Sequence, residues 1–113
     1  MSQNEVRYIK QGALEPNLQV ELRDGNGPMD VSTATAVTLN LYTAADVAIV
    51  SGGSCTFTSD GTDGLVEYAF VAGDTDTLGR HNFEIDVVWP GGRRTTYPDN
   101  GHAHLHVTKH LTA

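Results

Sequence analysis

The 113-residue sequence contains a single cysteine, Cys55. One cysteine excludes an intramolecular disulfide framework and a cysteine-rich zinc site, so packing and backbone hydrogen bonds must hold the fold. Long apolar runs are also missing, since no window of about 18 apolar residues occurs. The first residues lack the basic and apolar parts of a secretory signal. We therefore expect a soluble protein that does not enter a membrane.

Positive charge is scarce and unevenly distributed. The chain has seven Lys and Arg against fourteen Asp and Glu, which gives a formal net charge of −7. This balance disfavours non-specific attraction to nucleic acid or to an anionic membrane. No Lys or Arg lies between Arg23 and Arg80, and the eight charged residues from Asp24 to Asp76 are all acidic. The sequence therefore predicts an acidic side, suited to one-sided or head-to-tail docking against a basic neighbour.

Helix signals are weak, and the period-2 alternation of half-buried strands dominates. Weaker strands are expected at residues 6–10 and 54–59, while residues 43–50 and 72–78 are predicted to be connections. Five segments alternate clearly, and their inward side chains are predicted to form the core. These side chains are Leu18, Val20 and Leu22; Val37, Leu39 and Leu41; Val66, Tyr68 and Phe70; Phe83, Ile85, Val87 and Trp89; and Ala103, Leu105 and Val107.

Turn-forming clusters of Gly, Asp, Asn and Pro separate these segments. They lie at residues 24–28, 51–53, 60–64, 90–92 and 98–101. Many short strands with regular turn signals are typical of an all-β antiparallel sandwich. We therefore predict one immunoglobulin-like β-sandwich domain over residues 1–113, with about seven to eight short strands. The paired cysteines of true immunoglobulin domains are missing, so this prediction rests on strand number and pattern.

Three histidines, His102, His104 and His106, alternate along the last predicted strand and would share one face. Same-face residues are about 6.6–6.8 Å apart, which allows two imidazoles to bind one metal ion. Zinc would need further ligands from a neighbouring strand, and the sequence identifies none. A solvated polar face is the simpler interpretation. A third is a pH-sensitive interface, since neighbouring histidines repel one another once protonated.

Acidic residues near glycines raise the possibility of calcium. Asp24, Asn26 and Asp30 form one group, and Asp60, Asp63, Asp74 and Asp76 form another. Neither has the closing Glu of an EF-hand. Asp and Asn are also the ordinary residues of Asx-turns, which is the interpretation the sequence favours.

Catalytic motifs are missing: the sequence has no nucleophile elbow, phosphate-binding loop or His-Glu-x-x-His pattern. Cys55 has no adjacent base and fits a small buried side chain. Glu84 and Asp86 share a predicted strand face, but such pairs are common on solvated faces. Arg93 and Arg94 follow a turn and are far too few for a basic nucleic-acid surface. No enzyme activity and no cofactor are predicted.

The order of motifs along nearly the whole chain resembles a known structural family. The motifs are Tyr8-Ile9-Lys10-Gln11-Gly12, Val20-Glu21-Leu22-Arg23-Asp24-Gly25-Asn26-Gly27-Pro28, Gly64-Leu65-Val66-Glu67-Tyr68, Phe83-Glu84-Ile85, Trp89-Pro90-Gly91-Gly92-Arg93 and Tyr97-Pro98-Asp99-Asn100-Gly101. They are similar to the N-terminal immunoglobulin-like domain of baseplate upper proteins of tailed bacteriophages. The resemblance implies a non-enzymatic virion protein, an assembly and attachment module of the tail or baseplate.

This resemblance implies other phage structural proteins as partners and several symmetric copies in the virion. The N-terminal strand and the exposed sheet edges are the expected docking elements. Capsid decoration and a place at the head-tail neck remain alternatives. A carbohydrate-binding adsorption module is another, with Tyr8, Tyr42 and Tyr97 as its candidate aromatics. A metalloenzyme built on the histidine strand is a further alternative.

Overall fold

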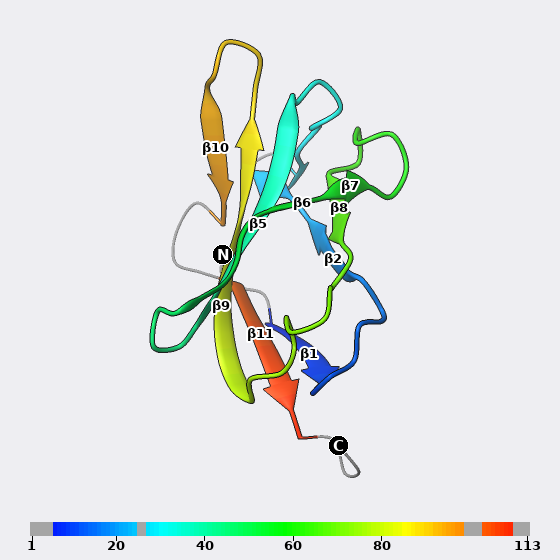
Figure 1. Ribbon diagram of the computed structural model, residues 1–113. Coiled ribbons are helices and arrows are strands. Elements are labelled where there is room, and N and C mark those ends of the chain that lie inside the picture. Colours follow the sequence, from blue (N-terminus) through cyan, green and yellow to red (C-terminus); the bar gives the residue numbers. More distant parts are fainter. Residues whose placement is uncertain (1–5, 25–26, 99–102, 110–113) are drawn as a thin grey trace.

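The computed structural model describes residues 6–24, 27–98 and 103–109. Its regular elements are all strands (Figure 1). Eight strands have four or more residues, and three are two-residue strands. The longer strands are β1 (Val6–Lys10), β2 (Leu18–Glu21), β5 (Ala36–Thr43), β6 (Ala48–Ser54), β8 (Leu65–Tyr68), β9 (Gly79–Val88), β10 (Arg94–Tyr97) and β11 (Ala103–Thr108); the short ones are β3 (Arg23–Asp24), β4 (Gly27–Pro28) and β7 (Thr56–Phe57).

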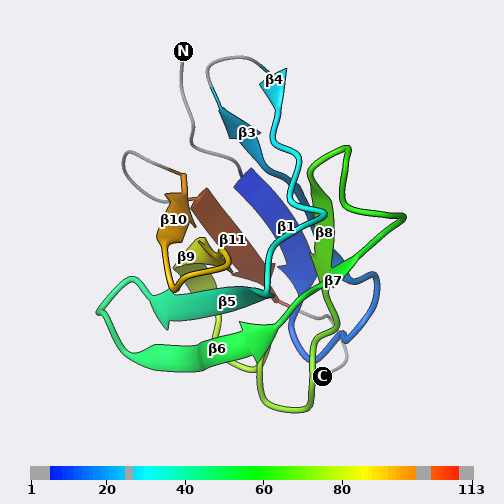
Figure 2. The same ribbon diagram turned by 90° about the horizontal axis from the view of Figure 1, so that it is seen from above.

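Two sheets enclose the core, so the predicted all-β sandwich is confirmed. The larger sheet has the order β1-β11-β9-β5-β6, with β10 pairing on β9. The smaller sheet has the order β2-β8-β7, and β3 and β4 form a separate hairpin. Seen from above, the smaller sheet lies across from the larger one, with β7 continuing from β6 (Figure 2). Strand β9 is central because it pairs with β5, β10 and β11.

One strand pair departs from the predicted antiparallel arrangement. β1 runs parallel to β11, with Val6 opposite His104 and Lys10 opposite Thr108. A parallel pair needs a long crossover, and here almost the whole chain lies between the two strands. The first and last strands of the described chain are therefore neighbours in the same sheet.

The alternation pattern identified most of the core. All the predicted inward side chains are buried except Trp89, which is half-buried and packs against the core edge. The structure adds four buried apolar residues, Ile9, Val31, Val50 and Tyr97. The prediction of Trp89 as a fully buried side chain was therefore wrong. Its indole Nε1 donates instead to Thr95 Oγ1 at 2.9 Å, at the edge of the sheet.

Two strands were predicted as connections or missed. Residues 48–50 belong to β6, although residues 43–50 were predicted to be a connection. Strand β10 was not predicted at all. The expected strand at residues 54–59 is reduced to β7, and Cys55 lies just before it. The glycine at position 53 suits the tight packing of β6. A Cβ added there would lie 2.6 Å from the Val50 side chain and 2.7 Å from the Tyr68 ring, so only glycine permits this close approach.

His81 is a buried polar residue on the inner face of β9 and is 1% exposed. Its Nδ1 lies 3.1 Å from the carbonyl oxygen of Gly79 and must donate, because that oxygen can only accept. Nε2 has no hydrogen-bond partner among the described residues. An orphaned buried polar group costs about 1–3 kcal/mol, whereas an apolar group of similar shape does not.

His81→Leu is therefore expected to leave the free energy of unfolding within about 1 kcal/mol of wild type, or to raise it. His81→Ala, which leaves a cavity, should lower it by about 2 kcal/mol or more. Urea unfolding of both variants measures the difference. Equal destabilisation by the two substitutions would contradict an orphaned Nε2 and would assign the imidazole a favourable polar contact.

No membrane-spanning helix is found within the residues that the structure describes.

Candidate functional site

The outward face of the larger sheet carries polar side chains that meet across strands. Tyr42 of β5 lies opposite Asn82 of β9, and Asn82 lies opposite His104 of β11. Nδ1 of His104 lies 2.9 Å from the amide oxygen of Asn82. The imidazole must donate in this hydrogen bond, because an amide oxygen can only accept. The row links three strands across the middle of the sheet face.

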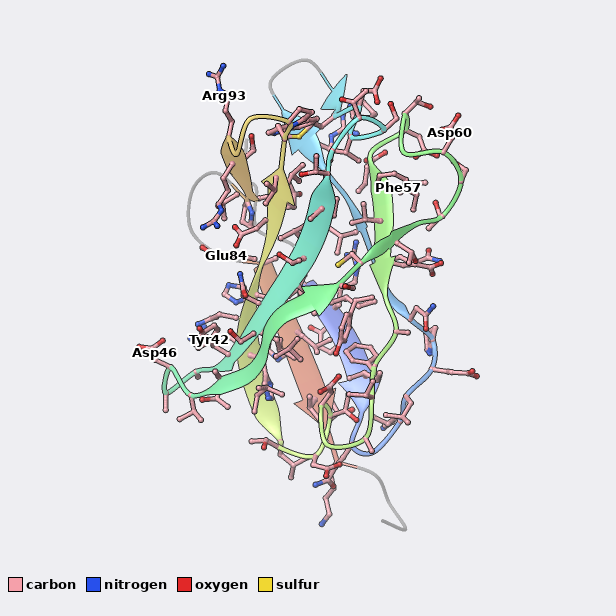
Figure 3. The ribbon with its side chains drawn as sticks, turned by 45° about the horizontal axis from the view of Figure 1, so that its top comes forward. Tyr42, Asp46, Phe57, Asp60, Glu84 and Arg93 are labelled. Atoms are coloured by element: carbon pink, nitrogen blue, oxygen red, sulfur yellow. The ribbon has the colours of Figure 1, made fainter. Side chains whose placement is uncertain are left out.

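A groove of about 400 Å³ opens on this face, and we call it the acidic groove. The amide of Asn40 is held at its floor: Nδ2 donates to Asp86 Oδ2 at 3.0 Å, and Oδ1 accepts from Gly52 N at 2.9 Å. Figure 3 shows Tyr42, Asp46 and Glu84 on the same side of the molecule. The groove is lined by Asn40, Tyr42, Asp46, Asn82 and Glu84.

Asp46 stands at the tip of the β5–β6 hairpin with a positive φ of 66°. Residues other than Gly, Asn and Asp seldom adopt a positive φ, so Asp is one of the few residue types that suit this position of the hairpin. The turn is closed by Thr43 N donating to Val47 O at 2.8 Å and Asp46 N donating to Thr43 O at 2.9 Å. The Asp46 carboxylate accepts no hydrogen bond from any residue that the structure describes. It is therefore available to a ligand or partner.

The predicted pair Glu84 and Asp86 does share a face, but Asp86 is fully engaged. One of its oxygens accepts from Asn40, and the other accepts from Thr96 Oγ1 at 2.7 Å. A general base or nucleophile needs an accessible oxygen, so the geometry gives Asp86 a role in joining β5, β9 and β10.

The three predicted histidines are only partly described. His104 and His106 do share the outward face, as predicted, while His102 lies outside the described residues. The His106 ring contacts the Tyr8 ring at a tilt of 38°, with 5.2 Å between ring centroids. His81 lies on the opposite face of the sheet and cannot join them. Within the described ranges, no group of three or more His, Cys, Asp or Glu could hold a metal ion.

Three of the acidic residues considered for calcium, Asp30, Asp60 and Asp63, form Asx-turns, as the sequence favoured. Asp30 accepts from Ser32 N at 2.9 Å and from its hydroxyl at 2.7 Å, and Asp60 does the same with Thr62 at 3.0 and 2.7 Å. These hydrogen bonds, first of all those from the hydroxyls, lower the pKa of both carboxyls. Asp63 likewise accepts from Ser59 and Leu65 N. Asn26 lies outside the described residues.

The acidic residues of the 24–76 stretch do not all lie on one side of the molecule. Asp46 and Asp60 lie on opposite sides in Figure 3. Asp74 is buried, and its Oδ2 accepts from the Tyr68 hydroxyl at 2.7 Å and from Val71 N at 2.9 Å. A charge pattern along the sequence does not form a patch when consecutive strands cross the domain from end to end. The acidic groups therefore form separate local sites.

Cys55 and Tyr68 are structural. Burial raises the pKa of the Cys55 thiol to about 12, so a thiolate does not form near neutral pH. Burial, followed by the hydrogen bond to Asp74, raises the pKa of Tyr68. The raised pKa of Cys55 agrees with the prediction of a thiol without catalytic activation, although its side chain is only half-buried.

A second surface lies where the two sheets meet, between β1 and β2, and we call it the β1 seam. Among the described strands β1 pairs only with β11 and β2 only with β8, so neither has a strand partner on the facing edge. Arg7 Nε donates to Gln19 O at 3.3 Å across the gap. A groove of about 250 Å³ here is lined by core side chains, and another of about 290 Å³ lies beside it. Both grooves are lined in part by Tyr8, Ile9 and Pro16.

Of the three tyrosines considered for carbohydrate binding, Tyr97 is buried at 3% exposure. That assignment was wrong, because Tyr97 points inward from β10 opposite Ile85. Tyr8 is 71% exposed and Tyr42 36%, and both lie on the outward face of the larger sheet. The row of exposed aromatics is therefore reduced to two.

Comparison with known proteins supports the fold. No family model matches the chain, and no curated protein matches it. Among solved structures, the chain is similar to the crystal structure of CopC from Methylosinus trichosporium OB3b, with 15% sequence identity and a TM-score of 0.51. The match covers 95% of this chain and 87% of the other. At this identity the likeness shows a shared β-sandwich fold.

Proposed function

We propose that this protein is a non-enzymatic structural protein of a tailed bacteriophage virion, an assembly and attachment module of the tail or baseplate. The order of motifs resembling the baseplate upper protein domain supports the phage assignment. The β1 seam supports the assembly role, because an edge strand beside an apolar groove offers both backbone groups and a side-chain pocket to a partner.

The β1 seam is suited to protein docking in three respects. Tyr8 projects from β1 with most of its surface exposed, and aromatic residues of this kind contribute strongly at interfaces. Val6 of the same strand is also exposed. The adjoining grooves reach core side chains such as Leu18 and Phe70, so an apolar side chain of the partner would be well buried.

Tyr8→Asp is expected to reduce incorporation into virus particles at least about tenfold, since the loss of a tyrosine that anchors an interface costs about 2 kcal/mol of binding free energy. Val47→Asp is the matched control, because Val47 is an apolar residue with 58% exposure on the β5–β6 hairpin, at the opposite edge of the larger sheet from β1. A point substitution is preferable to deleting residues 1–10, since Ile9 packs in the core at 7% exposure. Incorporation is measured by quantitative mass spectrometry of purified particles.

The location is tested with a tagged copy in the phage whose genome encodes the chain. Immunogold labelling at the tail or baseplate is the expected result. Labelling of the capsid or the neck would contradict the tail assignment and support those alternatives. Absence of the protein from purified particles would overturn the virion assignment, and equal incorporation of Tyr8→Asp and wild type would overturn the role of the β1 seam.

A further inference from the structure

Two arginines project from one end of the larger sheet. The turn between β9 and β10 is closed by Trp89 N donating to Arg93 O at 2.7 Å and Gly92 N donating to Trp89 O at 3.0 Å. Arg93 and Arg94 are exposed, and their side chains contact no acid or acceptor among the described residues. Arg93 points away from the molecule in Figure 3. We call this turn and its two guanidinium groups the arginine tip.

The acidic groove lies toward the other end of the same sheet. The β5–β9 ladder runs from Ala36 opposite Val88 to Thr43 opposite His81. Seven steps of about 3.4 Å separate these pairs by about 24 Å. The arginine tip follows Val88, whereas Asp46 follows Thr43. Opposite charges therefore project from opposite ends of one rigid sheet.

The acidic groove offers what a guanidinium group binds. The Asp46 carboxylate can accept its paired N–H donors, and such paired hydrogen bonds between ions are among the stronger ones in proteins. Glu84 adds a second negative charge to the lining of the groove. The Tyr42 ring supplies a face for stacking and for cation–π attraction. Asn40 is fixed by two hydrogen bonds, so part of the site is already ordered.

Other carboxylates are less suited to receive the arginine tip. Asp30, Asp60 and Asp63 already accept hydrogen bonds from their own turns, and Asp74 is buried. Binding an arginine there would compete with contacts that close the loops. Asp46 has no such contact with the described residues, and its hairpin tip is accessible. Charge complementarity thus favours the acidic groove as the site for the tip.

We propose that copies of this protein associate head to tail, with the arginine tip of one copy bound in the acidic groove of the next. The two surfaces of this contact differ, so the interface is heterologous and builds a ring or an open chain. Many weak contacts of this kind would act together in an assembly. The proposal goes beyond the β1 seam, since it concerns contact between copies and holds whichever partner that seam binds.

The test uses purified full-length protein in sedimentation velocity experiments at low salt. The tip variant Arg93→Gln/Arg94→Gln and the groove variant Asp46→Asn/Glu84→Gln each remove one side of the contact. Wild type is expected to associate with rising concentration, and each variant to bind itself at least about tenfold more weakly. An equimolar mixture of the two variants should form a heterodimer and stop there, because each supplies the surface that the other lacks.

Two controls separate this contact from general charge effects. Lys10→Gln/Lys109→Gln removes the same two positive charges from another part of the surface and should associate as wild type does. Asp46→Asn alone keeps a residue that tolerates positive φ, so it tests the groove if the double variant unfolds. Added salt should weaken the wild-type association, because exposed ion pairs are screened.

A wild-type protein that stays monomeric at millimolar concentration and low salt would overturn the proposal. So would a mixture of the two variants that behaves as the separate variants do, or self-association that survives both sets of substitutions. None of these results concerns Tyr8 or incorporation into particles, so the proposed function would be judged by its own experiment.

Discussion

Phe83→Ala is expected to lower the free energy of unfolding by about 3–5 kcal/mol. Phe83 is the largest of the fully buried side chains and is 1% exposed at the centre of β9. It lies opposite Leu41 of β5 on one side and Ala103 of β11 on the other, so its loss leaves a cavity in the middle of the larger sheet. Small domains have about 5–15 kcal/mol of stability in total, so we expect the variant to retain little folded protein.

Urea unfolding followed by circular dichroism measures this effect, with two comparisons. Val71→Ala, on an exposed loop, should change the free energy by less than about 0.5 kcal/mol. Trp89→Ala should fall between the two variants, because the indole is half-buried and at the sheet edge. A Phe83→Ala variant as stable as wild type would contradict the placement of this ring in the core. A Trp89→Ala variant as unstable as Phe83→Ala would restore the full core role expected from the sequence.

Local alternation predicted the core because a strand has only two faces. Segments such as Val37, Leu39 and Leu41 place every second side chain inward, and the buried residues follow that pattern. The pattern failed where strands carry glycine or small polar residues. Gly52 and Gly53 were interpreted as a turn, yet both lie in β6, where Gly53 allows close packing against Tyr68. Tyr97 was placed outside the predicted core because the four-residue strand β10, which carries it, was not predicted.

The N-terminal strand was an expected docking element, but the acidic groove and the geometry of the β1 seam could not be predicted from the sequence because both depend on pairing between distant segments. Asn40 and Glu84 face each other only through the β5–β9 register. The β1 seam requires the parallel pairing of β1 with β11, which no local pattern encodes. The positive φ of Asp46 became visible only with the fold, since residues 43–50 were predicted only as a connection. Arg93 and Arg94 were noted in the sequence, but their position opposite an acidic groove needed the fold.

Gly64→Ala is expected to destabilise the domain more than any other glycine substitution at a comparable φ. Gly64 has a φ of +74°, and a Cβ there would lie 2.6 Å from the carbonyl oxygen of Leu22 and 2.9 Å from that of Met29. Both neighbours are backbone atoms, so they cannot move aside as a flexible side chain could. The Gly64 carbonyl oxygen also accepts from Leu22 N at 2.8 Å, which ties the β7–β8 loop to the end of β2.

Gly12→Ala separates the two causes of this destabilisation. Gly12 has a φ of +81° but nothing within 4 Å of an added Cβ, so its substitution introduces only the backbone strain of about 1–2 kcal/mol. Gly64→Ala adds the backbone collision and should lose the Leu22–Gly64 hydrogen bond, seen as faster amide hydrogen exchange at Leu22. Equal losses of stability in the two variants would mean that the loop moves away freely. Since this loop also carries the Asp60 and Asp63 turns, a larger loss for Gly64→Ala would show that Leu22 and Met29 hold it against the sandwich.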